Sequence, residues 1–299
     1  MVGLKIIISK NMRPILNKIW LLILETITYF LLFFSFLFVI YMMGMIFSKL
    51  IVFDTNILFK HLFDSPYLET TISFIPQVII YIYSIHFLRK WFFKRNFAES
   101  GFSFDNFIPS LSFGFGWGFI FILTGFLTIL VFGEIEMSSP TWDGYLFLGE
   151  LTRFCFQSFS EEVMLRGFLA ATIAYYFGKH WAIFLSSMVF SLLHFANPNF
   201  GLIPSLTIFL SGIAMGILFF RFNNIWACTG LHWAWNFFQA TLFDFNVSGF
   251  DVYSFIRFKP LNPIWFSGGS FGFEGSIVSV IPLVLFCGWQ WQKLLKTNL

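Results

Sequence analysis

The small number of charged residues across its long apolar runs constrains the fold of this chain more than any other feature. Only 11% of its 299 residues are charged, 58% are hydrophobic, and 48 are Phe. A soluble domain carries about 25% charged residues to keep its surface in water. Lipid must therefore be the solvent of this chain, and a disordered or fibrous structure is excluded. We predict an all-α fold, a multi-pass transmembrane helical bundle.

The apolar runs define the predicted spans. A helix needs about 20 apolar residues to cross the hydrocarbon core, or fewer where its neighbours cover its ends. The fourth run would be roughly 50 Å long as one helix, so it must break near residues 158–160 or project from the bilayer. We expect about eight spans within a single integral membrane domain, residues 1–299, and an outer cap at 244–274. The spans are 19–47, 71–88, 111–133, 145–177, 181–195, 202–220, 225–243 and 275–292.

The basic residues support one orientation of this predicted bundle. With a cytoplasmic N-terminus, 12 of the 18 Lys and Arg residues lie on the cytoplasmic side, as the positive-inside rule expects. We therefore expect both termini in the cytoplasm and the chain in a plasma membrane of bacterial type. The net charge of +3 is small and scattered, so membrane lipids are expected partners and nucleic acid is not.

Three predicted spans carry polar side chains that are costly in lipid. Such residues are functional candidates by default. The fourth span contributes two acids and an arginine, the fifth a histidine, and the seventh a histidine and an amide. They are Glu161, Glu162 and Arg166, then His194, then His232 and Asn236.

Helix spacing divides the roles in the fourth span. Glu162 and Arg166 are four residues apart with the acid first, which favours an ion pair. Glu161 is about 100° away around the helix, so Arg166 is a poor partner for it. Pairing of Glu161 with Arg153 is the structural alternative. Without such a partner, Glu161 is a candidate general base.

The two histidine spans supply the other candidates. His232 and Asn236 are four residues apart, so one helix face presents an imidazole and an amide. Both can donate hydrogen bonds to a carbonyl oxygen that becomes negative, as in an oxyanion hole. His194 would help Glu161 to hold a water. On upright helices, however, His194 would stand about 20 Å deep and His232 about 9 Å, so their meeting requires tilt, a re-entrant segment or shifted boundaries.

The elements E-E-x-x-x-R, F-x-x-x-H and H-x-x-x-N, in this order on separate helices, resemble the CAAX-protease and bacteriocin-processing (Abi) family of intramembrane glutamic proteases. The resemblance covers residues 150–240, which form the expected catalytic core. It implies an endopeptidase without metal or cofactor, acting on a peptide or a membrane-protein segment that is lipidated in some relatives. The implied roles are water activation by Glu161 and His194, oxyanion stabilisation by His232 and Asn236, and structural support by Glu162 and Arg166.

Two other functions remain open from the residues alone. One is a zinc metallopeptidase that uses Glu161, His194 and His232 as ligands, a chemically suitable set that lacks the H-E-x-x-H motif. The other is a non-catalytic Abi-like membrane protein with a role in immunity, substrate binding or transport. The three cysteines fall in apolar runs without a C-x-x-C pair and are expected to be packing residues.

Overall fold

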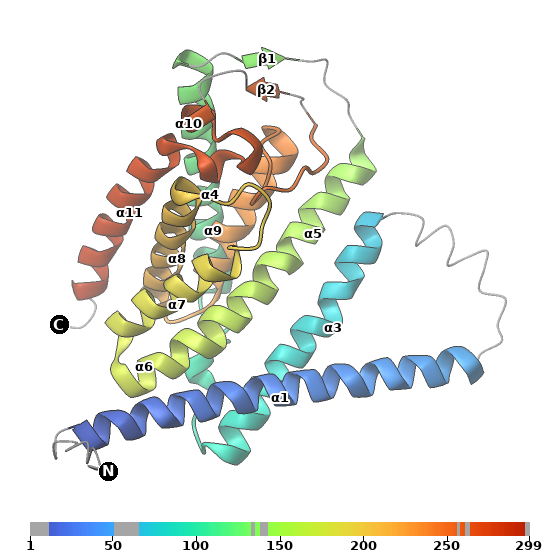
Figure 1. The fold of residues 1–299 in the computed structure, drawn as a ribbon, viewed down its shortest axis with the longest axis vertical. Coiled ribbons are helices and arrows are strands. Elements are labelled where there is room, and N and C mark those ends of the chain that lie inside the picture. The colour runs from blue at the N-terminus through green and yellow to red at the C-terminus, as the bar shows by residue number, and fades with distance from the viewer. Residues whose placement is uncertain are drawn as a thin grey trace, which may run out of the picture.

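The computed structural model describes residues 12–50, 66–132, 135–137, 143–255, 258–260 and 264–296. A helix occupies each of the eight predicted spans (Figure 1), which confirms the all-α class. These helices are α1 (Met12–Leu50), α3 (Pro66–Phe87), α4 (Phe107–Phe132), α5 (Gly144–Glu162) with its continuation to α6 (Ala171–Phe177), α7 (Lys179–Leu193), α8 (Leu202–Phe222), α9 (Trp226–Phe237) and α11 (Ile277–Lys296).

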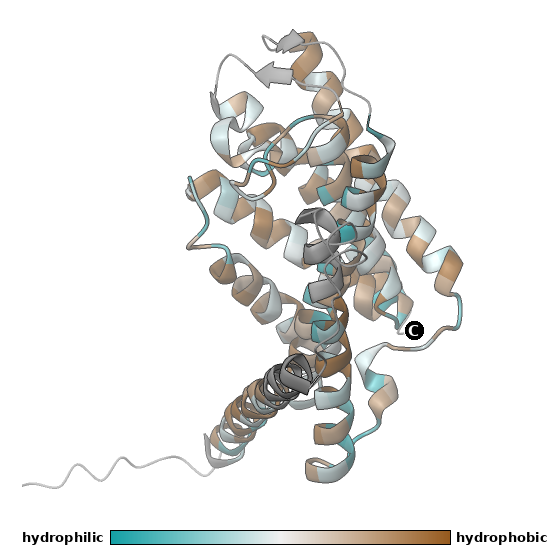
Figure 2. Ribbon diagram, turned by 90° about the vertical axis from the view of Figure 1, so that its right-hand side faces the viewer, coloured by the Kyte–Doolittle hydropathy of each residue, from teal (hydrophilic) through white to brown (hydrophobic). Residues whose placement is uncertain are grey.

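The outer surface of the bundle is apolar. Figure 2 shows hydrophobic residues along most of the helices, and the residues Phe34, Phe132 and Leu285 are each at least 60% exposed. Within the described part of the chain, four helices are long and apolar enough to cross a membrane unaided. They are Pro14–Phe36 of α1, α4, α8 and α11, and α7 is a shorter apolar helix. The chain is therefore a membrane protein.

The fourth predicted span is one long helical segment. The sequence predicts either a break near residues 158–160 or projection from the bilayer. The α-helix does not break at those residues, because α5 continues to Glu162. A π-helical turn, η3 (Val163–Ala170), follows at once and leads into α6. π-helical turns within α-helices are frequent at functional sites. Here the wide turn begins directly after the two candidate acids.

Helices α4 and α9 approach each other closely through glycine. A Cβ atom placed on Gly114 would lie 1.9 Å from the carbonyl oxygen of Ala227, and one on Gly230 would lie 2.3 Å from that of Leu111. Only a residue without a side chain allows such backbone contact. This contact fixes α9, which carries His232 and Asn236.

We expect the Gly114→Ala variant to be less stable than the wild type by about 1–3 kcal/mol, because the new methyl group meets rigid backbone. Gly116→Ala is the matched control on the same helix, since its Cβ would meet nothing within 4 Å. Thermal unfolding in detergent measures both variants. Equal stability of the two would contradict the described α4–α9 contact.

The G-x-x-x-G pair of α8 also serves helix packing. A Cβ on Gly212 would lie 2.9 Å from the Ser187 Cβ, and one on Gly216 would lie 3.3 Å from the Ile183 side chain. Both glycines thus face α7. The pair acts within the bundle, as its small residues lead one to expect.

Buried acids on α1 and α5 are neutralised locally. Glu25 of α1 forms an ion pair with Arg95, and Glu150 of α5 accepts a hydrogen bond of 2.7 Å from the Nε of Arg153. Both carboxylates are fully buried. A buried charge is tolerated when it is paired in this way.

The connection after α9, described at residues 243–255, 258–260 and 264–276, lies over one end of the bundle (Figure 1). It includes α10 (Ile264–Ser267), and its strand β2 (Phe258–Pro260) pairs antiparallel with β1 (Ile135–Met137). The expected outer cap is only part of its role. Its Phe245, Phe271 and Phe273 side chains enter the main hydrophobic core, so the connection also forms a wall of the interior.

Candidate active site

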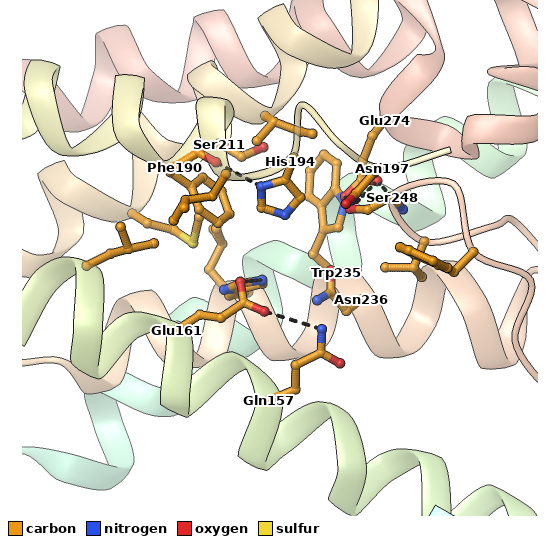
Figure 3. A pocket seen from close by; sticks show the side chains of 18 of the residues that line it. Gln157, Glu161, Phe190, His194, Asn197, Ser211, Trp235, Asn236, Ser248 and Glu274 are labelled. Carbon is orange, nitrogen blue, oxygen red and sulfur yellow. Dashed lines mark hydrogen bonds and ion pairs between the residues drawn. The ribbon is translucent and has the colours of Figure 1, made fainter. Parts of the chain in front are cut away.

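A cavity of about 330 Å³ lies between α5, η3, α7, α8, α9 and the 243–276 connection. Figure 3 shows several of its side chains pointing inward from these separate elements. The cavity brings together all four residues expected to be catalytic: Glu161, His194, His232 and Asn236. The two expected support residues are absent from its lining among the described residues.

The predicted ion pair between Glu162 and Arg166 lies behind the cavity wall. Arg166 Nη1 donates to Glu162 Oε1 at 2.9 Å, and both side chains are completely buried. Arg166 Nη2 also donates to the Gly212 carbonyl of α8 at 3.0 Å. The pair therefore joins α5 and η3 to α8, next to the cavity.

His232 connects the two acids. Its Nδ1 lies 2.9 Å from Glu162 Oε1, and its Nε2 lies 3.8 Å from Glu161 Oε2. Because an ionised carboxylate only accepts hydrogen bonds, Nδ1 carries a hydrogen and donates it to Glu162. Glu162 thus orients the ring, and Nε2 is the nitrogen directed at Glu161. The Nε2 atom donates a hydrogen bond only when the ring is protonated.

Glu161 has the surroundings of an available carboxylate. Its side chain is 26% exposed, and Gln157 Nε2 donates to its Oε1 at 3.3 Å. The alternative partner Arg153 is used elsewhere, since it binds Glu150 and the Oε1 of Gln157. The ion pair of Glu161 with Arg153 is therefore not formed.

His194 enters the cavity from the C-terminal end of α7. Its Nδ1 lies 2.8 Å from the Phe190 carbonyl oxygen. A carbonyl only accepts, so Nδ1 carries the hydrogen and Nε2 keeps a lone pair. In Figure 1, α7 is inclined to α8 and α9. His194 and His232 line the same cavity, so the two side chains meet as the proposed site requires.

Aromatic and amide groups complete the end of the cavity that holds the two imidazoles. The Phe190 ring meets both imidazoles edge to face, with centroids 4.8 Å from His194 and 5.7 Å from His232. Asn236 follows His232 by one turn of α9, and only 4% of the residue is exposed. Figure 3 shows its amide directed into the cavity.

Several lining residues were missed by the sequence analysis: Gln157, Asn197, Ser248 and Glu274. Glu274 is the most informative of them, because it is an acid with only 6% exposure. Burial raises the pKa of the Glu274 carboxyl, and the nearby His194 ring opposes this effect. One sequence signal was present: Glu274 is an isolated acid in a Phe- and Gly-rich stretch directly before a predicted span.

The zinc alternative requires three ligands close enough together to share one metal ion. Across the part of the chain that the structure describes, no three His, Cys, Asp or Glu side chains are grouped so that they could share a metal ion. The triad of Glu161, His194 and His232 suggested for zinc is therefore not assembled as a ligand set.

Comparison with known proteins agrees with the motif resemblance. Residues 144–238 match the family model described as "Type II CAAX prenyl endopeptidase Rce1-like". No curated protein and no solved structure matches the chain. The segment that carries the candidate site is therefore similar to this family of endopeptidases, and protease activity is the activity that this similarity suggests.

Proposed function

We propose that the protein is a metal-independent intramembrane endopeptidase whose site comprises Glu161, His194, His232 and Asn236. One observation carries this proposal. A partly exposed carboxylate, Glu161, lies 3.8 Å from an oriented imidazole in a cavity that also holds a second imidazole and an amide. Such a set can activate water and stabilise an oxyanion.

The proposed reaction begins with a water between Glu161 and His194. Glu161 takes a proton from the water, and the hydroxide oxygen attacks the carbonyl carbon of the substrate peptide bond. The lone pair on Nε2 of His194 accepts a hydrogen bond from the second O–H of that water and so aligns the water for attack. Held in this way, the water reacts within the cavity as if the step were unimolecular.

Charge on the former carbonyl oxygen is then stabilised by α9. The Asn236 amide donates a hydrogen bond to this oxygen. The protonated His232 ring donates a second one from Nε2, while its Nδ1–H remains hydrogen-bonded to Glu162. When the C–N bond breaks, the proton held by Glu161 passes to the leaving amine. One water is consumed, and a carboxyl and an amine are released.

The substrate class follows from the family and from the position of the site. We propose a peptide or a membrane-protein segment, with prenylated proteins as one candidate group because the family description names them. We also propose the plasma membrane with both termini cytoplasmic, on the basis of the basic-residue distribution, and a catalytic core at residues 150–240.

The decisive experiment uses purified protein in lipid vesicles, a peptide mixture and water labelled with ¹⁸O. We expect peptide fragments whose new carboxyl group carries one ¹⁸O atom, at the same rate with and without a chelator. Vesicles without protein are the control. Loss of activity with chelator and recovery with Zn²⁺ would favour the metallopeptidase, and an unchanged peptide mixture would favour a non-catalytic protein.

A further inference from the structure

Glu274 is a buried acid on the cavity wall that the proposed reaction does not use. It lies in the short turn η6 (Phe273–Gly275). Its Oε2 accepts hydrogen bonds from the backbone N–H of Ser248 at 2.7 Å and from the Ser248 hydroxyl at 3.1 Å. Figure 3 shows Glu274, Ser248 and Asn197 on one side of the cavity and Glu161 with Gln157 on the opposite side.

The buried acids of this bundle differ in their partners. Glu25, Glu150 and Glu162 are fully buried, and each is paired with an arginine: Arg95, Arg153 and Arg166 respectively. Glu274 has no such partner, because no Lys or Arg lies within 4 Å of it among the described residues. An ionised carboxylate in a poorly hydrated place is costly without a cation.

The lining of the cavity also lacks a cationic Lys or Arg side chain among the described residues. Its charged or titratable side chains, counted over the described residues, are two carboxylates and two imidazoles, with no Lys or Arg. His194 is the titratable group that faces Glu274, from the end of α7, while Ser248 and Gln239 offer neutral hydrogen bonds. The cavity therefore favours a guest that brings positive charge and disfavours a carboxylate.

We propose, resting on the proposed function, that the Glu274 carboxylate, held in place by the Ser248 backbone N–H, forms a subsite for a cationic nitrogen group of the substrate. That group is an ammonium or a guanidinium, supplied by a Lys or Arg side chain or by a free N-terminal amine. The subsite places the cation on one side of the cavity and the peptide bond near Glu161 on the other. The endopeptidase thus selects segments with a positive charge near the cleaved bond.

Glu274 also stabilises a turn, and the variants must separate this effect from charge. Ser248 has φ +50° and Gly249 has φ +90°, and the Glu274 carboxylate holds this turn through the Ser248 backbone. Glu274→Gln keeps a carbonyl oxygen that accepts this N–H but removes the charge. Ser248→Gly removes the hydroxymethyl side chain but keeps the backbone N–H, at a φ that glycine adopts readily.

The test measures kcat/KM for matched peptides with Lys, Gln or Glu at one position, each with a free or an acetylated N-terminus. For the wild type we expect Lys over Gln by about 10- to 100-fold, the effect of a hydrogen bond to a charged group, with Glu lowest. A preference that depends only on the free N-terminus assigns the cation to that amine. Glu274→Gln should abolish the preference, and Ser248→Gly should keep it.

A binding measurement keeps this test independent of catalysis. The Glu161→Gln protein should bind the fluorescent Lys peptide more tightly than the Gln peptide, even if no peptide is ever cleaved. Equal binding of the two would overturn the subsite. So would a Glu274→Gln variant that slows all peptides equally, since this result assigns Glu274 to the turn or to His194. Absence of cleavage with preserved Lys selectivity would instead reject the proposed function alone.

Discussion

Replacement of Glu161 by Gln is expected to lower kcat/KM for peptide cleavage by about 10²- to 10⁴-fold, because the variant loses its general base. The fold should persist. Glu161 is 26% exposed, and its described hydrogen bond comes from Gln157, which the oxygen of a Gln side chain can still accept. Cleavage is measured with purified protein in vesicles, and folding by thermal unfolding in detergent.

Glu150→Gln is the matched control for this experiment. It makes the same substitution in a buried acid of the same helix, outside the cavity lining and paired with Arg153. We expect it to cost stability and to leave the rate of the folded protein near that of the wild type. Similar rates for the Glu161 variant and the wild type would remove Glu161 from the reaction.

Replacement of Arg166 by Met is expected to cost about 3–5 kcal/mol of folding stability. Its partner Glu162 would remain completely buried without its arginine, and an uncompensated buried charge has a penalty of this size. The Gly212 carbonyl would also lose its donor. Thermal unfolding in detergent measures the loss, and a melting temperature equal to that of the wild type would contradict it.

The double variant Glu162→Leu with Arg166→Met separates structural support from catalysis. Apolar side chains of similar volume often replace a buried ion pair without loss of stability. We therefore expect the double variant to regain most of the stability lost by Arg166→Met. Its peptidase activity should nevertheless be lower than that of the wild type, because His232 Nδ1 would lose the acceptor that orients the ring.

Much of the fold could be predicted from the sequence, because apolar run length sets the spans directly. The π-helical turn η3 could not, since the residues Val163–Ala170 have an ordinary helical pattern. The α4–α9 contact was also hidden. The packing role of Gly114 in α4 depends on its contact with the backbone of α9. These two segments are distant in the chain, so the contact cannot be predicted from local sequence.

Only parts of the candidate site could be predicted from the sequence, for a similar reason. Spacing within one helix predicts the Glu162–Arg166 pair, and polar residues in spans point to the cavity. The contact between His232 and Glu162 joins two helices, so no local pattern contains it. Glu274 was missed because its role depends on how the 243–276 connection folds back against α7 and α9.

In the proposed mechanism, Glu161 and His194 act on the same water. The most direct test is kcat/KM of the double variant Glu161→Gln with His194→Asn, in which the Asn amide can still donate to the Phe190 carbonyl. If both residues serve one water, their losses are not additive, and the double variant should fall within about threefold of the weaker single variant. Losses that multiply across the two substitutions would show that they act in separate steps and would contradict the claim.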